Sequence, residues 1–276
     1  MNGPGLCSIH THSVCCDGKS TLAEMAAAAY AAGVRYFGAS GHSHTPIPAD
    51  QGNVLPEDWT PYKQEVLRLR QEYAGRMEVL LGIEWDSCAQ QPMPEGLDYW
   101  IGSVHDLRGG SPGCYYCVDW DRRMLEDCCR ELFHGDFRGV YRQYYADVAE
   151  MAGRRPPVLG HIDLITKLNG DGGLFDEDSG DYRQAALDAL HAADPAATLL
   201  EINTGAISRG YRRQPYPAQL LLREWRRMGG QVILTADAHW ADAIVYGYEQ
   251  AAAWAREAGY RESVLLTLEG WRTVPL

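Results

Sequence analysis

The sequence contains no long apolar run. No stretch of its 276 residues approaches the ~20 consecutive apolar residues that a membrane-spanning helix needs. The most apolar run, residues 23–33, is rich in alanine, too short and preceded by polar residues. The first six residues, MNGPGL, have neither the basic segment nor the apolar core of a secretory signal. We therefore expect a cytoplasmic protein that has no membrane partner.

The chain also lacks an excess of positive charge, because its 25 Lys and Arg residues are outnumbered by 37 Asp and Glu residues. Proteins that bind nucleic acids usually present a basic surface, so a formal net charge of −12 argues against a nucleic-acid partner. A small anionic substrate is still compatible with this charge, since a few local arginines can hold one phosphate.

No linker, low-complexity tract or change of composition divides the sequence, and we expect a single domain over residues 1–276. Its eight cysteines do not indicate a disulfide framework, because the chain is neither small nor signal-bearing. Two pairs, Cys114 with Cys117 and Cys128 with Cys129, could supply four thiolates to a structural zinc ion. The second pair is adjacent rather than separated by two residues, which favours ordinary packing. The role of the first pair stays open.

Seven short apolar or β-branched runs recur along the chain, and such runs suit strands buried on both faces. They occupy residues 5–9, 34–40, 77–83, 98–104, 157–160, 198–202 and 231–236. Helical patterns lie between them at 21–32, 56–75, 139–153, 181–193 and 216–230, the first opened by a Thr21–Glu24 capping box. Segment 106–136 is less regular, and we expect a lid or an excursion there. The alternation predicts a parallel sheet, and seven units predict a barrel or a strongly curved sheet.

Each apolar run is followed by imidazole or carboxylate side chains. Because the C-terminal ends of parallel strands meet on one face, we expect these side chains to gather there. In chain order they are His10, His12, Asp17, His42, His44, Glu84, His105, His161, Asp163, Glu201, Asp237 and His239, and the amide of Asn203 accompanies Glu201. Imidazole nitrogen combined with carboxylate oxygen suits Zn²⁺, Mn²⁺ or Fe²⁺. The sequence therefore predicts a metal site on this face. Glu201 and Asn203 could either support the ligands or touch substrate.

Together these motifs resemble the PHP (polymerase and histidinol phosphatase) family. The segments IHTHSVCCDG, ASGHSHTP, LLGIEWD, IGSVHDL, VLGHIDLITK and LTADAHWADAI are similar to its motifs, in chain order. Within the family, residues 200–217 (LEINTGAISRGYRRQPYP) resemble the histidinol-phosphate phosphatase branch. The resemblance implies an α/β fold, namely a distorted (β/α)7 barrel of the PHP type with its metal site at the C-terminal ends of the strands.

The resemblance also implies a centre of two to three divalent metal ions, either Zn, Mn or Fe. It implies that the first ion is held by His10, His12, Glu84 and Asp237. Glu84 would bridge to a second ion held by His105 and His161. A third ion would be held by Asp17, His42 and His239. The second motif of the family usually reads Asp-His, whereas Gly41 precedes His42 here. We expect the supporting hydrogen bond of that aspartate to be either lost or rerouted through Ser43 or His44.

The implied activity is hydrolysis of L-histidinol phosphate to L-histidinol and phosphate in histidine biosynthesis, through attack of a metal-activated hydroxide on phosphorus. The expected catalytic residues are Glu84, Asp237 and His239, with Asp237 or a histidine handling the proton. The expected substrate-binding residues are Arg209 and Arg212, which would grip phosphoryl oxygens, together with Ser43 and His44.

Two alternatives keep the metal site but change the function. The first is a PHP-family phosphoesterase of different or broader substrate range, although a nuclease should show a basic groove. The second is a non-catalytic metal-binding module, which would need only about four ligands, fewer than this sequence offers. The expected partner is a small phosphorylated substrate, bound by the chain alone or by a homo-oligomer.

Overall fold

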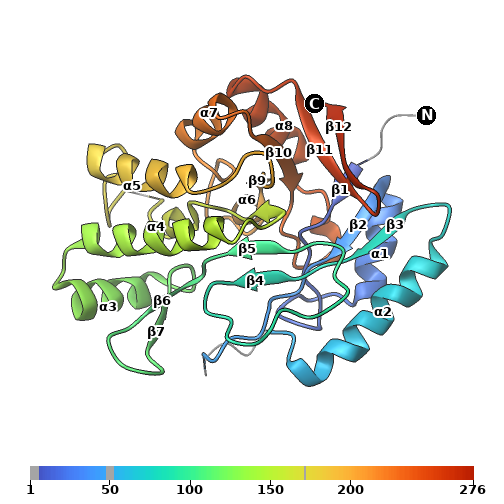
Figure 1. Ribbon diagram of the computed structural model, residues 1–276, viewed down its shortest axis with the longest axis horizontal. Helices are drawn as coiled ribbons and strands as arrows, with labels where there is room; N and C mark the ends of the chain where they lie inside the picture. The colour runs from blue at the N-terminus through green and yellow to red at the C-terminus, as the bar shows by residue number, and fades with distance from the viewer. Residues whose placement is uncertain (1–5, 48–52, 171) are drawn as a thin grey trace.

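Parallel strands form the centre of the fold (Figure 1). The computed structural model describes residues 6–47, 53–170 and 172–276. Within these ranges the central strands are β1 (Leu6–Ser8), β2 (Val34–Ala39), β3 (Glu78–Leu81), β4 (Glu84–Asp86), β5 (Ile101–Ser103), β8 (Val158–Leu159), β9 (Leu199–Asn203) and β10 (Gln231–Thr235). Each of the seven predicted runs overlaps one of these strands, and six of the runs contain the whole strand. Gly5, the first residue of the first run, lies outside the described residues.

The strands close into a distorted barrel. One parallel sheet has the order β1-β2-β3, and the other has the order β10-β9-β8-β5-β4. Only two residues separate β3 from β4, so the two act as one interrupted strand that joins the sheets. Parallel bridges from Thr11 to Ala238 and from His42 to Glu84 connect the sheets near their C-terminal ends. The predicted distorted (β/α)7 barrel is therefore confirmed.

Helices cover the barrel on several sides, with α3, α4 and α5 on one side and α1 and α2 on the other (Figure 1). The predicted helices correspond to α1 (Leu22–Ala31), α2 (Trp59–Glu72, preceded by η1, Pro56–Asp58), α4 (Phe137–Gly153), α5 (Gly180–His191) and α7 (Gln219–Arg227). Thr21 caps α1 as predicted. Its hydroxyl accepts a hydrogen bond from the Glu24 backbone N–H at 3.2 Å, and the Glu24 carboxylate accepts one from the Thr21 backbone N–H at 2.8 Å. The helix predicted at 216–230 begins three residues later, since Tyr216 instead pairs with Asn203.

The prediction that segment 106–136 is irregular was wrong. It forms an antiparallel hairpin of β6 (Asp106–Arg108) and β7 (Tyr115–Cys117), followed by helix α3 (Arg122–Phe133). The side chain of Asp121 begins α3 by accepting a hydrogen bond from the Met124 backbone at 2.7 Å. This segment packs against α4 and extends the barrel at the end where the strands terminate.

Several short or C-terminal elements were not predicted. They are η2 (Leu164–Thr166), α6 (Gly205–Ser208), η3 (Ala241–Ala243), α8 (Tyr248–Glu257) and the antiparallel pair β11 (Glu262–Thr267) and β12 (Gly270–Pro275). In Figure 1 the β11–β12 hairpin lies beside β1 and β2, and the C-terminus is on this side. Across the described ranges, no helix is long and apolar enough to cross a membrane.

Candidate metal centre

Nine ligand-type side chains lie together at the C-terminal ends of the barrel strands. They are the nine for which the sequence predicts metal binding. Their ligand atoms form four overlapping groups among the described residues, and within each group the atoms lie within 4.8 Å of one another. The groups are His12–Asp17–His42–His239, His10–His12–Asp237, His10–Glu84–His161 and His42–Glu84–His105. His105 and His161, which the resemblance placed on one ion, fall in different groups, but their ring centroids lie 5.1 Å apart and both contact Glu84 Oε1.

Glu84 lies at the centre of this cluster. It begins β4 and is buried with 1% relative exposure. Its carboxylate oxygens contact imidazole nitrogens at 3.2 Å for His10, 3.4 Å for His12, 3.1 Å for His42, 3.4 Å for His105 and 2.9 Å for His161. One carboxylate therefore touches imidazoles that follow four different strands, a position suited to bridging two ions.

Two buried imidazole nitrogens test whether metal ions fit these residues. His10 Nε2 and His12 Nε2 have no hydrogen-bond partner among the described residues. Both nitrogens face Asp237 Oδ1, at 3.7 Å and 3.2 Å respectively, as well as Glu84. An unsatisfied buried polar atom is costly, and a lone pair aimed at carboxylates is satisfied by a cation between them. The residues present therefore fit divalent metal ions.

Asp237 is fixed from two sides. Its backbone has a φ of 48°, in the left-handed region that few residues other than glycine adopt. Arg209 Nη2 donates to Asp237 Oδ2 at 3.0 Å, and Arg209 Nη1 donates to His239 Nδ1 at 2.9 Å. A Cβ at Gly205 would lie 2.6 Å from Asp237 Oδ2, so only glycine permits this close approach. The other oxygen, Oδ1, is left facing the imidazoles.

Cys16 and Val54 pack against Gly41, where a side chain would not fit. A Cβ at Gly41 would lie 2.9 Å from Val54 Cγ2 and 3.3 Å from Cys16 Sγ. The thiol of Cys16 lies 3.6 Å from His12 Nδ1, yet it belongs to none of the four ligand groups found among the described residues. Cys16 and Val54 therefore occupy the room that a larger residue at position 41 would need.

Ser43 supports the cluster indirectly. Its hydroxyl accepts a hydrogen bond from the Asp86 backbone at 2.9 Å. Asp86 Oδ2 in turn accepts from the ring Nδ1 of His105 at 3.0 Å and from the backbone of the same residue at 3.1 Å. His44 Nδ1 is buried without a hydrogen-bond partner among the described residues. These contacts lead from Ser43 to His105 rather than to His42, so they do not replace the supporting hydrogen bond of the second motif.

The ligand cluster forms part of a cavity of about 730 Å³. Arg209 lines this cavity, as do Lys167 and Asp119, which were not predicted as site residues. Lys167 Nζ lies 2.7 Å from Asp119 Oδ2, and both side chains are largely buried. The remaining wall includes the aromatic side chains of Tyr115, Trp120 and Tyr211. Lys167 follows the VLGHIDLIT run directly, but nothing in the sequence indicates that Asp119, 48 positions earlier, would lie beside it.

Two predicted substrate-binding residues are not part of the cavity wall in the described structure. His44 is one of them. The other is Arg212, whose guanidinium donates to the Thr166 carbonyl at 3.0 Å and lies 5.1 Å from the centre of the Tyr216 ring. These contacts tie the 209–213 segment to η2 and so suit a structural role for Arg212.

The thiols form no second metal centre among the described residues. All eight cysteines are free, and Cys128 and Cys129 are buried on α3. Cys117 donates to Asp119 Oδ1 at 3.1 Å. No group of three ligand-type atoms that includes a thiol is found in the described ranges, so packing is the better explanation of both cysteine pairs.

Imidazoles and carboxylates shift each other's pKa values in this cluster. Burial opposes the charged form of His10, but neighbouring carboxylates, Glu201 foremost, outweigh it and hold the pKa of His10 well above its usual range. The pKa values of His42 and His105 are raised in the same way. Burial also opposes ionisation of Glu84, yet the surrounding imidazoles hold its pKa well below its usual range. Without metal, these four side chains therefore form buried ion pairs, whereas burial lowers the pKa of His12 to about 3.

We expect the metal-free protein to lose stability as the pH rises above about 6.5. Histidines whose pKa is raised on folding stabilise the fold fully below that pH, and this contribution disappears as the pH rises through the folded pKa. Carboxylates with a lowered pKa stay ionised throughout, so they add no change in this range. Metal binding has the opposite dependence, because an imidazole must be deprotonated to bind an ion.

Thermal unfolding between about pH 6 and pH 8.5, with chelator and with Zn²⁺ or Mn²⁺, measures this difference. The gap in Tm between the two forms should widen with pH and reach about 5–10 °C at a metal concentration 100-fold above Kd. A gap that narrows as the pH rises would contradict the expectation.

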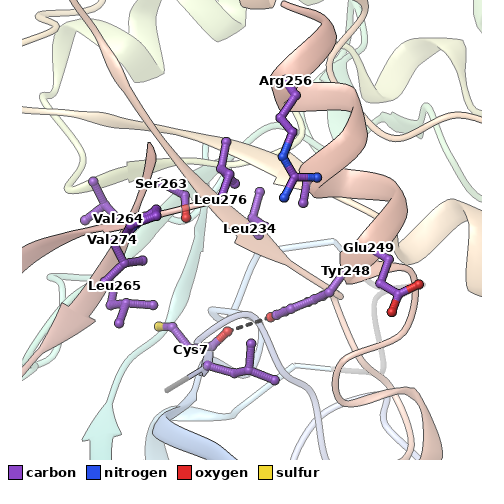
Figure 2. Close-up of a pocket in the computed structure, with 13 residues that line it drawn as sticks. Cys7, Leu234, Tyr248, Glu249, Arg256, Ser263, Val264, Leu265, Val274 and Leu276 are labelled. Carbon is purple, nitrogen blue, oxygen red and sulfur yellow. Dashed lines mark hydrogen bonds between the residues drawn. The ribbon is translucent and has the colours of Figure 1, made fainter. Parts of the chain in front are cut away.

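A second cavity, of about 680 Å³, lies between β1, β10, α8 and the β11–β12 hairpin (Figure 2). Its walls are mainly apolar, with Leu234, Val264 and Leu265 among them. Figure 2 shows Tyr248 donating a hydrogen bond to the carbonyl of Cys7, at 2.7 Å. None of the four ligand groups of the described residues lies in this cavity. The metal chemistry therefore belongs to the first cavity.

Comparison with known proteins yields one family and several relatives. The model of the PHP domain matches residues 8–205. A protein of Deinococcus radiodurans named probable histidinol-phosphatase is 30% identical to this chain, and the match covers 93% of this chain and 95% of that protein. The Bacillus subtilis histidinol-phosphatase is 26% identical, with 74% of this chain and 79% of that protein covered.

A solved structure from Lactococcus lactis has a similar fold. It matches with a TM-score of 0.71 at 18% identity, covering 97% of this chain and 98% of that one. That structure is described as histidinol phosphate phosphatase complexed with Zn, L-histidinol and phosphate. At this level of identity the likeness establishes the fold.

Proposed function

This chain belongs to the PHP-domain family, and from that premise we propose that it is a metal-dependent phosphatase that hydrolyses L-histidinol phosphate to L-histidinol and phosphate. The observation that carries the proposal is a cluster of nine ligand-type side chains, seven of which line one cavity together with Arg209. The names of two curated relatives and the ligands of the Lactococcus lactis structure support the choice of substrate.

The cluster supplies more ligands than a structural ion needs, which favours catalysis. Those that would hold the ions are His10, His12, Asp17, His42, Glu84, His105, His161, Asp237 and His239. Bound divalent ions generate a nucleophile from water near neutral pH and neutralise the charge of phosphoryl oxygens. Hydrolysis of phosphate monoesters is among the slowest uncatalysed reactions, so this contribution is required.

Arg209 has two roles in the proposal. Burial opposes ionisation of Asp237, but Arg209 and His10 outweigh it and hold the pKa of Asp237 well below its usual range. Arg209 also lines the cavity, where its planar guanidinium can donate two hydrogen bonds to phosphoryl oxygens. We assign proton transfer to Asp237 and His239, which Arg209 holds in contact with each other and with the cavity.

The Lys167–Asp119 pair suits a substrate that carries charges of both signs. Lys167 adds a second cation to the cavity for the phosphate. Asp119 adds a carboxylate, and although burial opposes its ionisation, Lys167 and His105 keep its pKa below its usual range. A carboxylate favours the protonated amine or imidazole of L-histidinol phosphate and disfavours sugar and nucleotide phosphates, which have no such cation. This pair supports the narrow substrate range.

A phosphoesterase of broader range is the second candidate function, because the nine ligands alone do not distinguish among monoesters. The two are separated by phosphate release from a panel that contains L-histidinol phosphate, p-nitrophenyl phosphate, a hexose phosphate and a nucleoside monophosphate. We expect kcat/KM for L-histidinol phosphate to exceed the others by about 100-fold or more, because the other substrates bring no cation to the cavity beside Asp119. Metal content is measured on the same sample. Comparable rates across the panel would favour the broader enzyme.

A further inference from the structure

A carboxylate that belongs to none of the four ligand groups lies directly behind them. Glu201, in the middle of β9, has 0% relative exposure. Its Oε1 accepts hydrogen bonds from His10 Nδ1 and, at 2.7 Å, from Thr235 Oγ1. Its Oε2 accepts from the His161 backbone at 2.7 Å and from Asn203 Nδ2 at 3.0 Å. Four donors therefore converge on one buried carboxylate, three of them on or beside other strands and one, Asn203, on β9 itself.

We propose that Glu201 is a positioning residue of the metal centre, which holds the ring proton of His10 on Nδ1 so that Nε2 is free to bind an ion. An ionised carboxylate can only accept hydrogen bonds, so its partner nitrogen must carry a proton. In a neutral ring the other nitrogen then keeps its lone pair. His10 Nε2 is the atom that faces Glu84 and Asp237. The inference rests on the metal centre of the proposed function.

The contact with His161 extends this role to a second ligand. His10, Glu84 and His161 form one of the four groups, and Glu201 holds two of its three members. It fixes the ring of His10 and the backbone of His161, so both ligands are positioned by the same buried group. Supporting carboxylates of this kind orient ligand histidines and raise their basicity.

Asp86 repeats the arrangement at the other side of the cluster. It accepts from both the ring Nδ1 and the backbone of His105, which belongs to a different group from His10. Two carboxylates outside the groups thus each hold one imidazole Nδ1 and one histidine backbone N–H. The repetition provides an internal comparison, because a change at Asp86 should affect His105 and leave His10 unchanged.

Glutamine at position 201 would reverse the proton position. With its amide NH₂ at the place of Oε2, it would face two donors, the His161 backbone and Asn203. With the NH₂ at the place of Oε1, it would donate to His10 Nδ1, and the Thr235 hydroxyl could turn to accept. The second orientation has fewer clashes, but it drives the His10 proton to Nε2 and blocks that nitrogen as a ligand.

The test compares the full chain with Glu201→Gln, Asp86→Asn and the control Thr235→Val, which removes one donor but keeps the carboxylate. Zinc affinity is measured by competition with a chromophoric chelator, and ¹⁵N chemical shifts of labelled histidines in the zinc-loaded chain report which ring nitrogen carries the proton. We expect Glu201→Gln to weaken zinc binding about 10–100-fold. Thr235→Val should bind within about 3-fold of the unchanged chain. Asp86→Asn should alter the signals of His105 alone.

The unchanged chain already tests the inference, even if a variant does not fold. Its zinc-loaded form should show His10 protonated at Nδ1 and bound through Nε2, and the opposite pattern would overturn the proposal. Unaltered affinity and an unaltered His10 signal in Glu201→Gln would also overturn it. Equal weakening by Glu201→Gln and Thr235→Val would indicate a merely structural role. If the unchanged chain binds no zinc, manganese or iron, it is the proposed function that fails.

Discussion

Replacing Glu84 with glutamine is expected to remove bound metal and phosphatase activity together, with kcat/KM lowered on the order of 10³-fold or more. The carboxylate of Glu84 contacts the imidazoles of five histidines and belongs to two of the four ligand groups. An amide has no negative charge to offer an ion. Its NH₂ would also point a donor at ring nitrogens that must bind metal.

Glu57→Gln is the matched control for this substitution. Glu57 lies on η1, is exposed and belongs to none of the four ligand groups of the described residues, so Glu57→Gln is the same chemical change outside the cluster. Metal content by elemental analysis, circular dichroism and turnover of L-histidinol phosphate are measured on both variants. Glu57→Gln should match the unchanged chain in all three. A folded Glu84→Gln protein that retains full metal content and turnover would refute the proposed centre.

The barrel could be predicted because its signal is local and repeated. Each parallel strand must be buried on both faces, so it appears in the sequence as a short apolar run, and β9 from Leu199 to Asn203 is buried throughout. The convergence of the ligand-type residues then follows from topology alone, since all parallel strands end on one face. For this reason the strand pattern by itself places His10 and His239, 229 positions apart, in one cluster.

Pairings between distant loops could not be predicted in the same way. Lys167 meets Asp119 only because the β6–β7 hairpin and α3 fold back over the strand ends. The sequence also gives Arg209 and Arg212 almost identical surroundings. Their difference arises from α6, which ends at Ser208 and leaves Arg209 directed at Asp237 while Arg212 turns to Thr166.

The sequence also does not distinguish the expected metal ligand Glu84 from the positioning residue Glu201. Glu84 and Glu201 are both buried acidic residues at apolar strands, and both lie among histidines. Glu84 faces imidazole nitrogens that follow several strands. Glu201 instead accepts hydrogen bonds from one backbone N–H, one side-chain amide, one hydroxyl and the ring of His10. A carboxylate already saturated by four donors has little capacity left for an ion. That saturation is a property of the folded neighbourhood, not of the local sequence.

Arg209→Ala is expected to lower kcat/KM for L-histidinol phosphate by about 10²–10³-fold, as for loss of a donor that stabilises transition-state charge. The substitution removes the guanidinium from the cavity and from Asp237 Oδ2, so both phosphoryl binding and the low pKa of Asp237 are affected. Arg209→Lys should recover only part of the loss, because one ammonium cannot replace a planar pair of donors. The control is Arg213→Ala, an exposed residue of the same segment that should retain activity.

Arg212→Ala tests whether Arg212 binds the phosphate or holds its segment in place. Its guanidinium is bound to Thr166 and stacks near Tyr216, so the substitution should lower Tm while kcat stays within about 3-fold of the unchanged chain. A large rise in KM with unchanged Tm would instead favour direct contact with the phosphate. Steady-state kinetics and thermal unfolding of the four arginine variants therefore determine which guanidinium meets the substrate and which one holds the segment against η2.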